Sequence, residues 1–296
     1  MTKIKTGKRS VPLGGRIFTV FAYLYLILFA VTVLIPFFVV LITSVTKQSE
    51  LISTMDFIWF PKEGLTAEGY YTALFSDILD AYGISVLRGF FNTLWQTLLT
   101  LLVGLFVSGL SAFSFAKLRF PGKRVLFYIL IGTMMIPGAV MTMPSYIFYD
   151  AIGWSNSVLP IVIPGMFGGA MTVFFLRQFF MTIPTELLEA AKIDGLGFFG
   201  MYVRIMIPLA KPAFLAQFIF GFVGGYNNYL APLLYLNGQT ELYPLQMVIT
   251  LFNSIYSGNL TAVCAFIVIG LAPLLIIYSF SQKYFIQGIA AEGIKG

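Results

Sequence analysis

Six long apolar runs divide this sequence. Each is long enough to cross the ~30 Å hydrocarbon core of a bilayer as a helix, which takes about 20 residues. Apolar residues make up 58% of the chain and charged residues 10%, and a soluble core could not bury that share. We therefore predict an all-α integral membrane protein with six transmembrane helices. The runs lie near residues 17–43, 91–115, 125–148, 158–180, 213–235 and 261–284.

The basic residues assign the two sides of the membrane. Six spans place both termini on one side, and the loops of the other side hold only Lys47, Lys62 and Arg88 of the 18 Lys and Arg residues. Because cytoplasmic loops are enriched in Lys and Arg, we expect both termini in the cytoplasm. The expected parts are a cytoplasmic tail 1–16, a transmembrane domain 17–285 with an extracellular loop 44–88 and a cytoplasmic loop 181–208, and a cytoplasmic tail 286–296.

The residue types give little support to catalysis. The chain has no His and a single Cys, so the commonest general base and metal ligand are missing and we expect no catalytic or metal site. No Gly-x-x-x-x-Gly-Lys-(Ser/Thr) phosphate loop occurs. The predicted spans contain no Asp or Glu, which disfavours an ion-coupled secondary carrier. The basic residues are scattered, so no nucleic-acid partner is expected.

A polar segment between the fourth and fifth runs is expected to form a helix, a turn and a second helix. Pro184 is compatible with the first turn of a helix. Gly195 supplies the left-handed conformation that ends many helices. A helical pattern resumes at residues 198–207, before Pro208. This arrangement would hold a short helix at the surface.

The first of these two helices carries a compact sequence motif. Two small residues, Ala190 and Ala191, follow Glu189, and we expect them to form a surface ridge that a partner's backbone approaches closely. The spacing of Glu-Ala-Ala, three residues, Gly, nine residues and Ile-x-Ile-Pro resembles the cytoplasmic EAA loop of permease subunits in ABC importers, with Ile207 where that family usually has Leu. The residues that this resemblance assigns to coupling with an ATPase are Glu189, Ala190, Ala191, Asp194, Gly195, Ile205 and Pro208.

Polar residues also occur within the second and fifth spans. Unpaired amides in lipid are costly, so these side chains must face other helices or water. They either line a path for a hydroxyl-rich solute or form hydrogen bonds between helices. The candidates for the path are Asn92, Gln96, Gln217, Tyr226, Asn227, Asn228 and Tyr229.

Three further features concern packing. The stripe of Gly104, Ser108, Ser111 and Ala112 permits close contact between helices in lipid. Residues 66–75 are expected to form a short outer helix that either packs on the membrane rim or docks a partner. Prolines near the outer end of the third span, Pro137 and Pro144, suggest a kink.

Other segments extend the resemblance over nearly the whole chain. Residues 112–123, 222–229 and 288–296 resemble conserved segments of carbohydrate-uptake ABC permeases, in particular the second (G-type) permease of the maltose importer family. The resemblance implies a non-catalytic subunit in a bacterial cell membrane, which translocates a sugar or oligosaccharide. An ABC permease for a glycerol phosphate or a peptide is the alternative.

The resemblance also implies partners. They are a second homologous permease, two cytoplasmic ATPases that bind ATP and Mg, and an extracellular sugar-binding protein. Glu189 would pair with a basic residue of an ATPase, and Lys295 and Gly296 would reach between the two ATPases. Residues 243–246 would extend toward the binding protein. No cofactor is expected on this chain itself.

Overall fold

A computed structural model describes the backbone of residues 13–54 and 58–293, and the side chains of 18–54 and 58–280. Within these ranges the chain is helical, and its extended pairing is an isolated bridge between Thr46 and Leu65. Lys295 and Gly296 lie outside the described residues.

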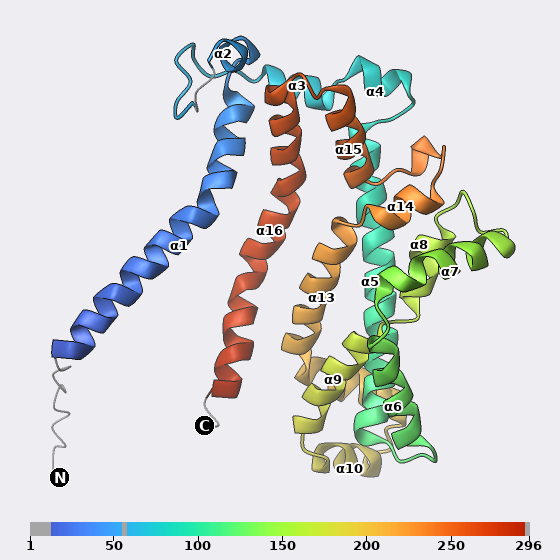
Figure 1. The fold of residues 1–296 in the computed structure, drawn as a ribbon. Helices are drawn as coiled ribbons and strands as arrows, with labels where there is room; N and C mark the ends of the chain where they lie inside the picture. Colours follow the sequence, from blue (N-terminus) through green and yellow to red (C-terminus); the bar gives the residue numbers. More distant parts are fainter. Residues whose placement is uncertain (1–12, 55–57, 294–296) are drawn as a thin grey trace.

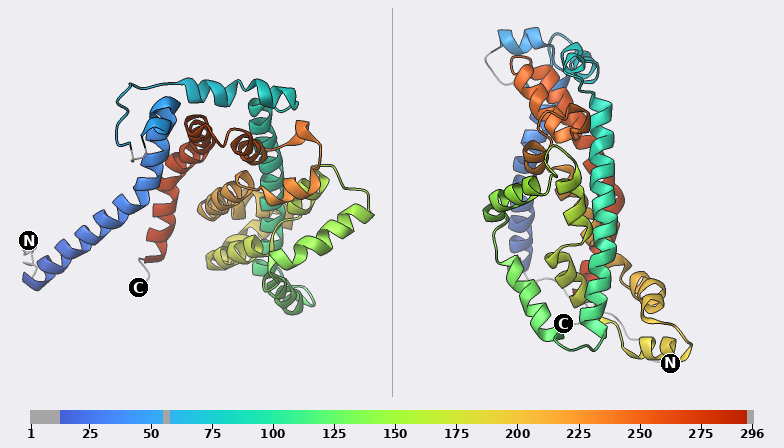
Figure 2. Two further views of the ribbon diagram at one scale, coloured as in Figure 1. Left: turned by 45° about the horizontal axis from the view of Figure 1, so that its top comes forward. Right: turned by 90° about the vertical axis from the view of Figure 1, so that its right-hand side faces the viewer.

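The long helix α5 is the centre of the fold. It runs over most of the height of the molecule (Figures 1 and 2) and packs most extensively against α8, α9, α13 and α15. A residue's place along α5 therefore decides which part of the molecule it contacts. α5 spans Val86–Lys117, and its neighbours are α8 (Leu159–Met166), α9 (Ala170–Thr182), α13 (Lys211–Tyr226) and α15 (Leu245–Ile255).

Four of the six predicted spans, the first, second, fourth and sixth, correspond to long apolar helical segments. By length and composition, four described helical segments are apolar enough to cross a membrane, and up to six if each of two bent pairs is one span. The bent pairs are Lys123–Met134 with Gly138–Ala151, at 97°, and Phe198–Leu209 with Lys211–Tyr226, at 81°. The four segments are Phe18–Val45, Val86–Lys117, Leu159–Thr182 and Leu260–Phe280.

The third predicted span is bent far more sharply than a kinked helix. α6 (Lys123–Met134) ends before Pro137, and α7 (Gly138–Ala151) begins directly after it. Pro137 has extended backbone angles, with φ −61° and ψ 129°, and its ring removes the backbone N–H that a continuous helix would need. Pro144, by contrast, lies inside α7. The predicted irregularity therefore occurs at the first of the two prolines only.

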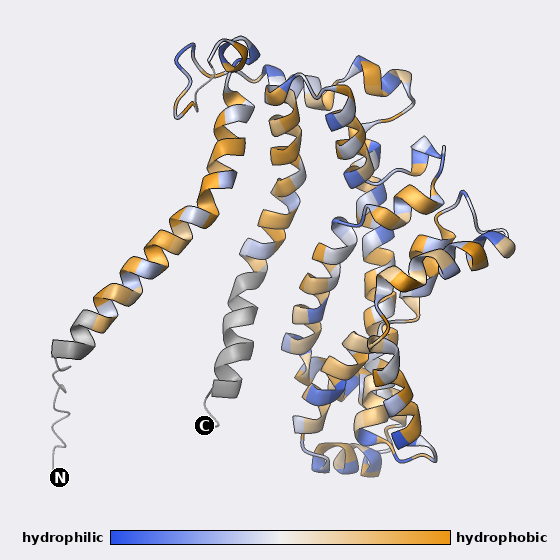
Figure 3. Cartoon of the chain, viewed as in Figure 1, coloured by the Kyte–Doolittle hydropathy of each residue, from blue (hydrophilic) through white to orange (hydrophobic). Residues whose placement is uncertain are grey.

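α1 (Leu13–Val45) packs on α16 (Leu260–Gly293) and on α3 (Glu68–Leu74) near one end and diverges from the rest of the bundle along its length (Figure 1). Most of its described apolar side chains are exposed, and Figure 3 shows hydrophobic residues along the whole described helix. Lipid or another apolar surface is the environment that suits such a helix.

The outer segment confirms the short helix expected at residues 66–75. The helix is α3, and the hydroxyl of Thr66 accepts a hydrogen bond from Glu68 N at 3.2 Å. Gly69 of α3 lies so close to Thr261 of α16 that a Cβ would be only 2.7 Å from the Thr261 carbonyl oxygen. This contact supports the packing interpretation of the helix. α2 (Gln48–Ser53) and α4 (Asp77–Ala81) complete the segment.

Two clusters of buried apolar side chains hold the helices together. One joins α3, α5, α13, α15 and α16 near the end that carries α2 to α4. The other joins the last turns of α5 to α9, α10 and the segment after it, at the opposite end (Figure 1). The second cluster is the base on which the Glu-Ala-Ala motif rests.

Candidate functional site

The predicted helix, turn and helix is present at one end of the molecule. α10 comprises Glu186–Ile193 and lies across the lower end of the bundle in Figure 1. Gly195 follows it with φ +84°, a conformation that L side chains rarely adopt. The chain then continues through α11 (Phe198–Met201), a π-helical turn (Tyr202–Met206) and α12 (Ile207–Leu209).

The two faces of α10 have different environments. Leu188 and Ala191 are buried, at 7% and 6% exposure, and belong to the second core cluster. Glu189 and Ala190 are exposed, and Ile193 is 87% exposed. α10 thus presents a carboxylate, a small residue and a large apolar side chain to the surroundings. The exposed apolar residue, Ile193, is not part of the sequence motif.

The expectation that both alanines lie on the surface is wrong for Ala191. With 3.6 residues per turn, positions 188 and 191 share one side of the helix. That side packs against the chain's own core, so of the two alanines only Ala190 lies with Glu189 on the outer face.

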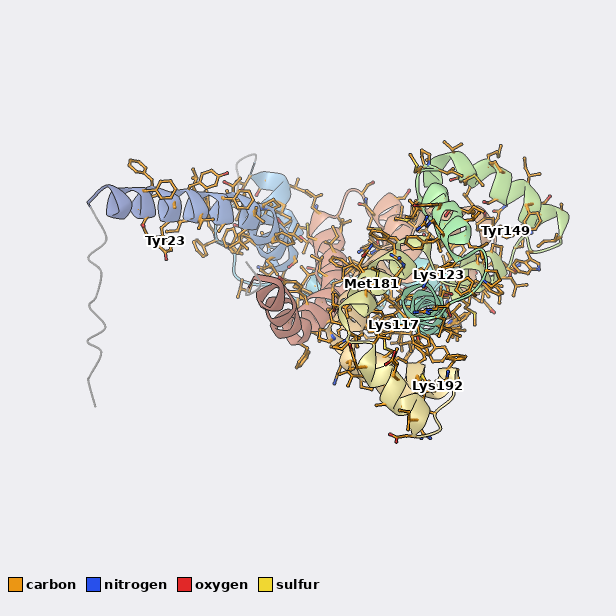
Figure 4. All side chains as sticks on the ribbon, turned by 90° about the horizontal axis from the view of Figure 1, so that it is seen from below. Tyr23, Lys117, Lys123, Tyr149, Met181 and Lys192 are labelled. Atoms are coloured by element: carbon orange, nitrogen blue, oxygen red, sulfur yellow. The ribbon has the colours of Figure 1, made fainter. Side chains whose placement is uncertain are left out.

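The remaining motif residues surround this face. Asp194, Gly195 and Pro208 are exposed, whereas Ile205 is half-buried against the core cluster. Figure 4 shows Lys192 on α10, which projects from the bundle in this view. The motif therefore combines exposed positions with positions that hold the loop in place.

Polar contacts from α5 fix the base of this loop. Lys117, in the last turn of α5, donates a hydrogen bond to the Ile183 carbonyl just before α10, and Figure 4 shows Lys117 near the loop. Partial burial lowers the pKa of the Lys117 amino group, and the charge of nearby Glu186 opposes that shift. Tyr202 is fully buried and donates its hydroxyl to the Phe106 carbonyl of α5 at 2.8 Å. The sequence pattern indicated neither of these two contacts.

A cavity of about 180 Å³ lies further along α5, among α5, α8, α9, α13 and α14 (Leu230–Tyr235). Its polar lining comes mainly from one face of α5. Backbone breaks also reach it, because Gly168 and Gly169 separate α8 from α9 and Asn228 separates α13 from α14. The polar side chains of the lining are Thr93, Gln96, Thr97, Thr100, Ser108, Thr172 and Asn228.

The small-residue stripe of α5 brings helices together here, as expected. A Cβ on Gly104 would collide with the Gly165 carbonyl oxygen of α8. Ser108 accepts a hydrogen bond from Gly169 N at 3.1 Å. The backbone freed by the α8–α9 break is thereby bonded to α5.

Of the amides on α5, Gln96 lines the cavity and Asn92 does not. Asn92 Nδ2 donates to the carbonyls of Glu241 and Tyr243 at 2.7 and 3.1 Å. Gln96 Nε2 donates to the Leu242 carbonyl at 3.0 Å. Both side chains therefore hold the loop that precedes α15, and Gln96 also faces the cavity.

The polar cluster at the end of α13 is similarly divided. Asn228 lines the cavity, whereas Gln217, Asn227 and Tyr229 lie outside its lining. Tyr226 is also outside, fully buried, and donates its hydroxyl to an α16 carbonyl, that of residue 270, at 2.9 Å. The Asn227 side chain is instead bonded to Gln246 and to the backbone of its own helix.

Hydroxyl residues of α5 were missed as candidates. Thr93, Thr97 and Thr100 all line the cavity, at spacings of four and three residues that place them on one helical face with Gln96. This spacing in the sequence could have identified the three threonines as candidates for the cavity lining. Among the described residues, no group of three His, Cys, Asp or Glu side chains could hold a metal ion.

Comparisons with known proteins identify the family to which the chain belongs. Residues 101–291 match the family model of the binding-protein-dependent transport system inner membrane component. The arabinooligosaccharides transport system permease protein AraQ of Bacillus subtilis (strain 168) is 31% identical over 274 residues, which cover 92% of this chain and 94% of that protein. The sn-glycerol-3-phosphate transport system permease protein UgpE of Brucella abortus (strain 2308) is 28% identical over 270 residues, or 90% and 94% of the two chains.

The fold has a solved counterpart. A chain from the crystal structure of a bacterial ABC transporter involved in the import of the acidic polysaccharide alginate superposes with a TM-score of 0.80 at 23% identity, over 94% of this chain and 100% of that chain. The family model covers most of the sequence, and AraQ aligns with almost all of it. The chain therefore belongs to the family of inner membrane components of binding-protein-dependent transport systems.

Proposed function

We propose that this chain is a permease subunit of an ABC importer, which carries a sugar or oligosaccharide into the cell at the expense of ATP hydrolysed by partner ATPases. The observation that carries the proposal is the face of α10, where Glu189 and Ala190 are exposed on a helix whose opposite face is buried. The names of AraQ and of the polygalacturonan/rhamnogalacturonan permease YtcP of Bacillus subtilis support a saccharide as the solute.

In this proposal the bent pair of α6 and α7 contributes one span, and α13, the second part of the other bent pair, contributes another, which gives six spans with both termini in the cytoplasm. Residues 17–285 form the permease domain, residues 44–88 lie outside the cell, and residues 181–208 form the cytoplasmic coupling loop. The basic side chains Lys117, Lys123 and Lys192 gather at the α10 end (Figure 4), which agrees with a cytoplasmic position. The tails 1–16 and 286–296 are cytoplasmic, and Lys295 and Gly296 contact the ATPases.

The coupling route follows the contacts of α10. Glu189 pairs with a basic residue of an ATPase, and closure of the ATPase dimer around ATP and Mg moves α10. Since the α10 base is bonded to α5 through Lys117 and Tyr202, and α5 lines the cavity, movement at the loop shifts the helices around the solute. The spans then change from inward-open to outward-open and accept sugar from the binding protein. This subunit performs no catalysis and holds no cofactor.

Uptake in proteoliposomes tests the proposal. The chain is reconstituted with its sister permease, ATPases and binding protein, and uptake of labelled oligosaccharides is compared with ATP and with an imposed ion gradient. Glu189→Arg is expected to abolish ATP-dependent uptake because it reverses the charge offered to the ATPase. Glu68→Arg, an exposed reversal on the outer helix α3, is the matched control and is expected to leave uptake intact.

Two results would overturn the proposal. Uptake driven by an ion gradient without ATPases would indicate a secondary carrier. Equal uptake by the Glu189→Arg complex and the unmodified complex would remove α10 from the coupling route.

A further inference from the structure

The cavity on α5 contains polar atoms that the fold leaves free. Gln96 is only 5% exposed, and its Nε2 is directed to the Leu242 carbonyl. Because a carbonyl oxygen only accepts, this bond fixes the amide orientation and leaves Gln96 Oε1 as an acceptor. No described residue donates a hydrogen bond to that oxygen.

A second free group lies one residue further along α5. Thr97 is 7% exposed and lines the cavity, and its hydroxyl makes no hydrogen bond to any described residue. A hydroxyl both donates and accepts. Thr97 therefore offers either function to a solute.

The third free group lies at the break between α13 and α14. Asn228 Oδ1 accepts a hydrogen bond from Ala231 N at 3.4 Å, which leaves Asn228 Nδ2 without an acceptor among the described residues. The three side chains thus supply an acceptor, a hydroxyl and a donor around one cavity. The described lining includes no charged side chain.

We propose that this cavity receives one unit of a neutral saccharide and discriminates against uronates and phosphate esters. The inference rests on the importer function proposed above and specifies its solute. The relatives' names do not distinguish neutral from anionic solutes, because they include an arabinooligosaccharide permease, a polygalacturonan/rhamnogalacturonan permease and a glycerol-3-phosphate permease. The inference makes that distinction for this chain.

The chemistry of the free atoms carries this choice. A sugar hydroxyl donates one hydrogen bond and accepts others, so sugar hydroxyls can use both the acceptor and the donor in this lining. A carboxylate or phosphate oxygen only accepts, and it would face Gln96 Oε1 without a proton to offer. Proteins bind such anions with Arg, Lys or clustered N–H groups, and a charge without a partner is costly to bury.

The size of the cavity sets the length of the unit. Its volume of about 180 Å³ is below the ~300–1,000 Å³ of pockets that enclose drug-sized ligands. A longer saccharide would therefore pass with one ring at a time in this cavity.

The test measures binding by the purified complex of two permeases and two ATPases without the binding protein, so that the binding protein's own selection does not contribute. Saturation-transfer NMR is recorded with arabinotriose and with trigalacturonate at equal concentration. Arabinotriose is expected to give at least a tenfold stronger signal. Thr97→Val, which keeps the shape of the side chain and removes the hydroxyl, is expected to reduce the arabinotriose signal severalfold.

A charge substitution tests the selection itself. Asn228→Lys places a cation in the cavity and is expected to raise the ratio of trigalacturonate to arabinotriose signal severalfold. Asn227→Lys, one residue away and outside the lining, is the control and should leave that ratio unchanged. Thr97→Val keeps the inference testable if Asn228→Lys fails to assemble.

The inference is overturned if trigalacturonate binds as well as arabinotriose, if neither binds, or if Thr97→Val leaves the arabinotriose signal unchanged. Equal ratios for the two lysine variants would also overturn it. ATP-dependent uptake of trigalacturonate alone would leave the importer function standing and refute the neutral solute. Loss of ATP dependence for every solute would refute the importer function.

Discussion

Ala190 and Ala191 provide a matched pair for testing how α10 works. They are neighbours in sequence, yet Ala190 is exposed and Ala191 is 6% exposed within the core cluster. The same substitution, to Leu, should therefore act on two different surfaces. One belongs to the permease itself, and the other is the proposed contact with an ATPase.

The expected magnitudes follow from these environments. Leu at position 191 adds three carbon atoms where Leu188, Phe113 and Met201 already belong to the same closed cluster, and overpacking of this kind costs about 1–3 kcal/mol. Leu at position 190 extends into the surroundings, where substitutions usually change stability by less than about 0.5 kcal/mol. Helix propensity contributes little in either case, because Leu is close to Ala.

Two measurements separate the effects. Unfolding of the isolated permease pair in mixed micelles should show a loss of stability for Ala191→Leu and none for Ala190→Leu. Co-purification of the ATPases should be weakened by Ala190→Leu, since the added side chain stands beside Glu189 on the exposed face. Equal destabilisation by the two variants, or normal ATPase binding by Ala190→Leu, would refute the assignment of the two faces.

Three further outcomes are expected. Tyr226→Phe removes the buried hydrogen bond to the Gly270 carbonyl and should cost about 0.6 kcal/mol, the average for such bonds in membranes, in micellar unfolding, without changing solute preference. Glu50, 4% exposed, accepts two backbone N–H groups of the outer loop. Glu50→Ala should cost about 1.5–3 kcal/mol per bond and make residues 58–65 sensitive to external protease. Tyr202→Phe removes the buried hydrogen bond to the Phe106 carbonyl of α5 and should likewise cost about 0.6 kcal/mol in micellar unfolding.

The long spans were predictable because their signal is local. Four of the runs correspond to continuous or nearly continuous apolar helical segments, and hydropathy alone determines such segments. The turn at Gly195 was equally predictable, since the left-handed conformation favours one residue type. The angle at Pro137 was not, because a proline fixes where a helix stops and the packing of α6 and α7 decides the direction in which the chain continues.

The roles of the polar residues could be predicted only as a set. Asn92 and Gln96 share one face of α5, and the sequence gives no reason to separate them. The carbonyls of the loop before α15 accept two hydrogen bonds from Asn92 Nδ2 and one from Gln96 Nε2. The difference lies in the oxygens, because Asn92 Oδ1 accepts a hydrogen bond from Trp95 Nε1 at 3.1 Å. Gln96 thus keeps an oxygen for the cavity. The distant loop therefore orients both amides, and Trp95 decides which amide oxygen remains available.

The helix breaks give the more general argument for the site. Within a bilayer, irregular backbone is tolerated where it is buried in protein or lines a water-filled cavity. The break between α8 and α9 is bonded by Ser108, and the break after α13 is capped by Asn228, and both residues line the same cavity. Two interruptions of the apolar pattern, far apart in sequence, therefore meet at one place on α5. Because hinges usually lie at loop or element-terminal residues, the place that would bind a neutral sugar ring is also the place where movement of α10 is expected to alter the cavity walls.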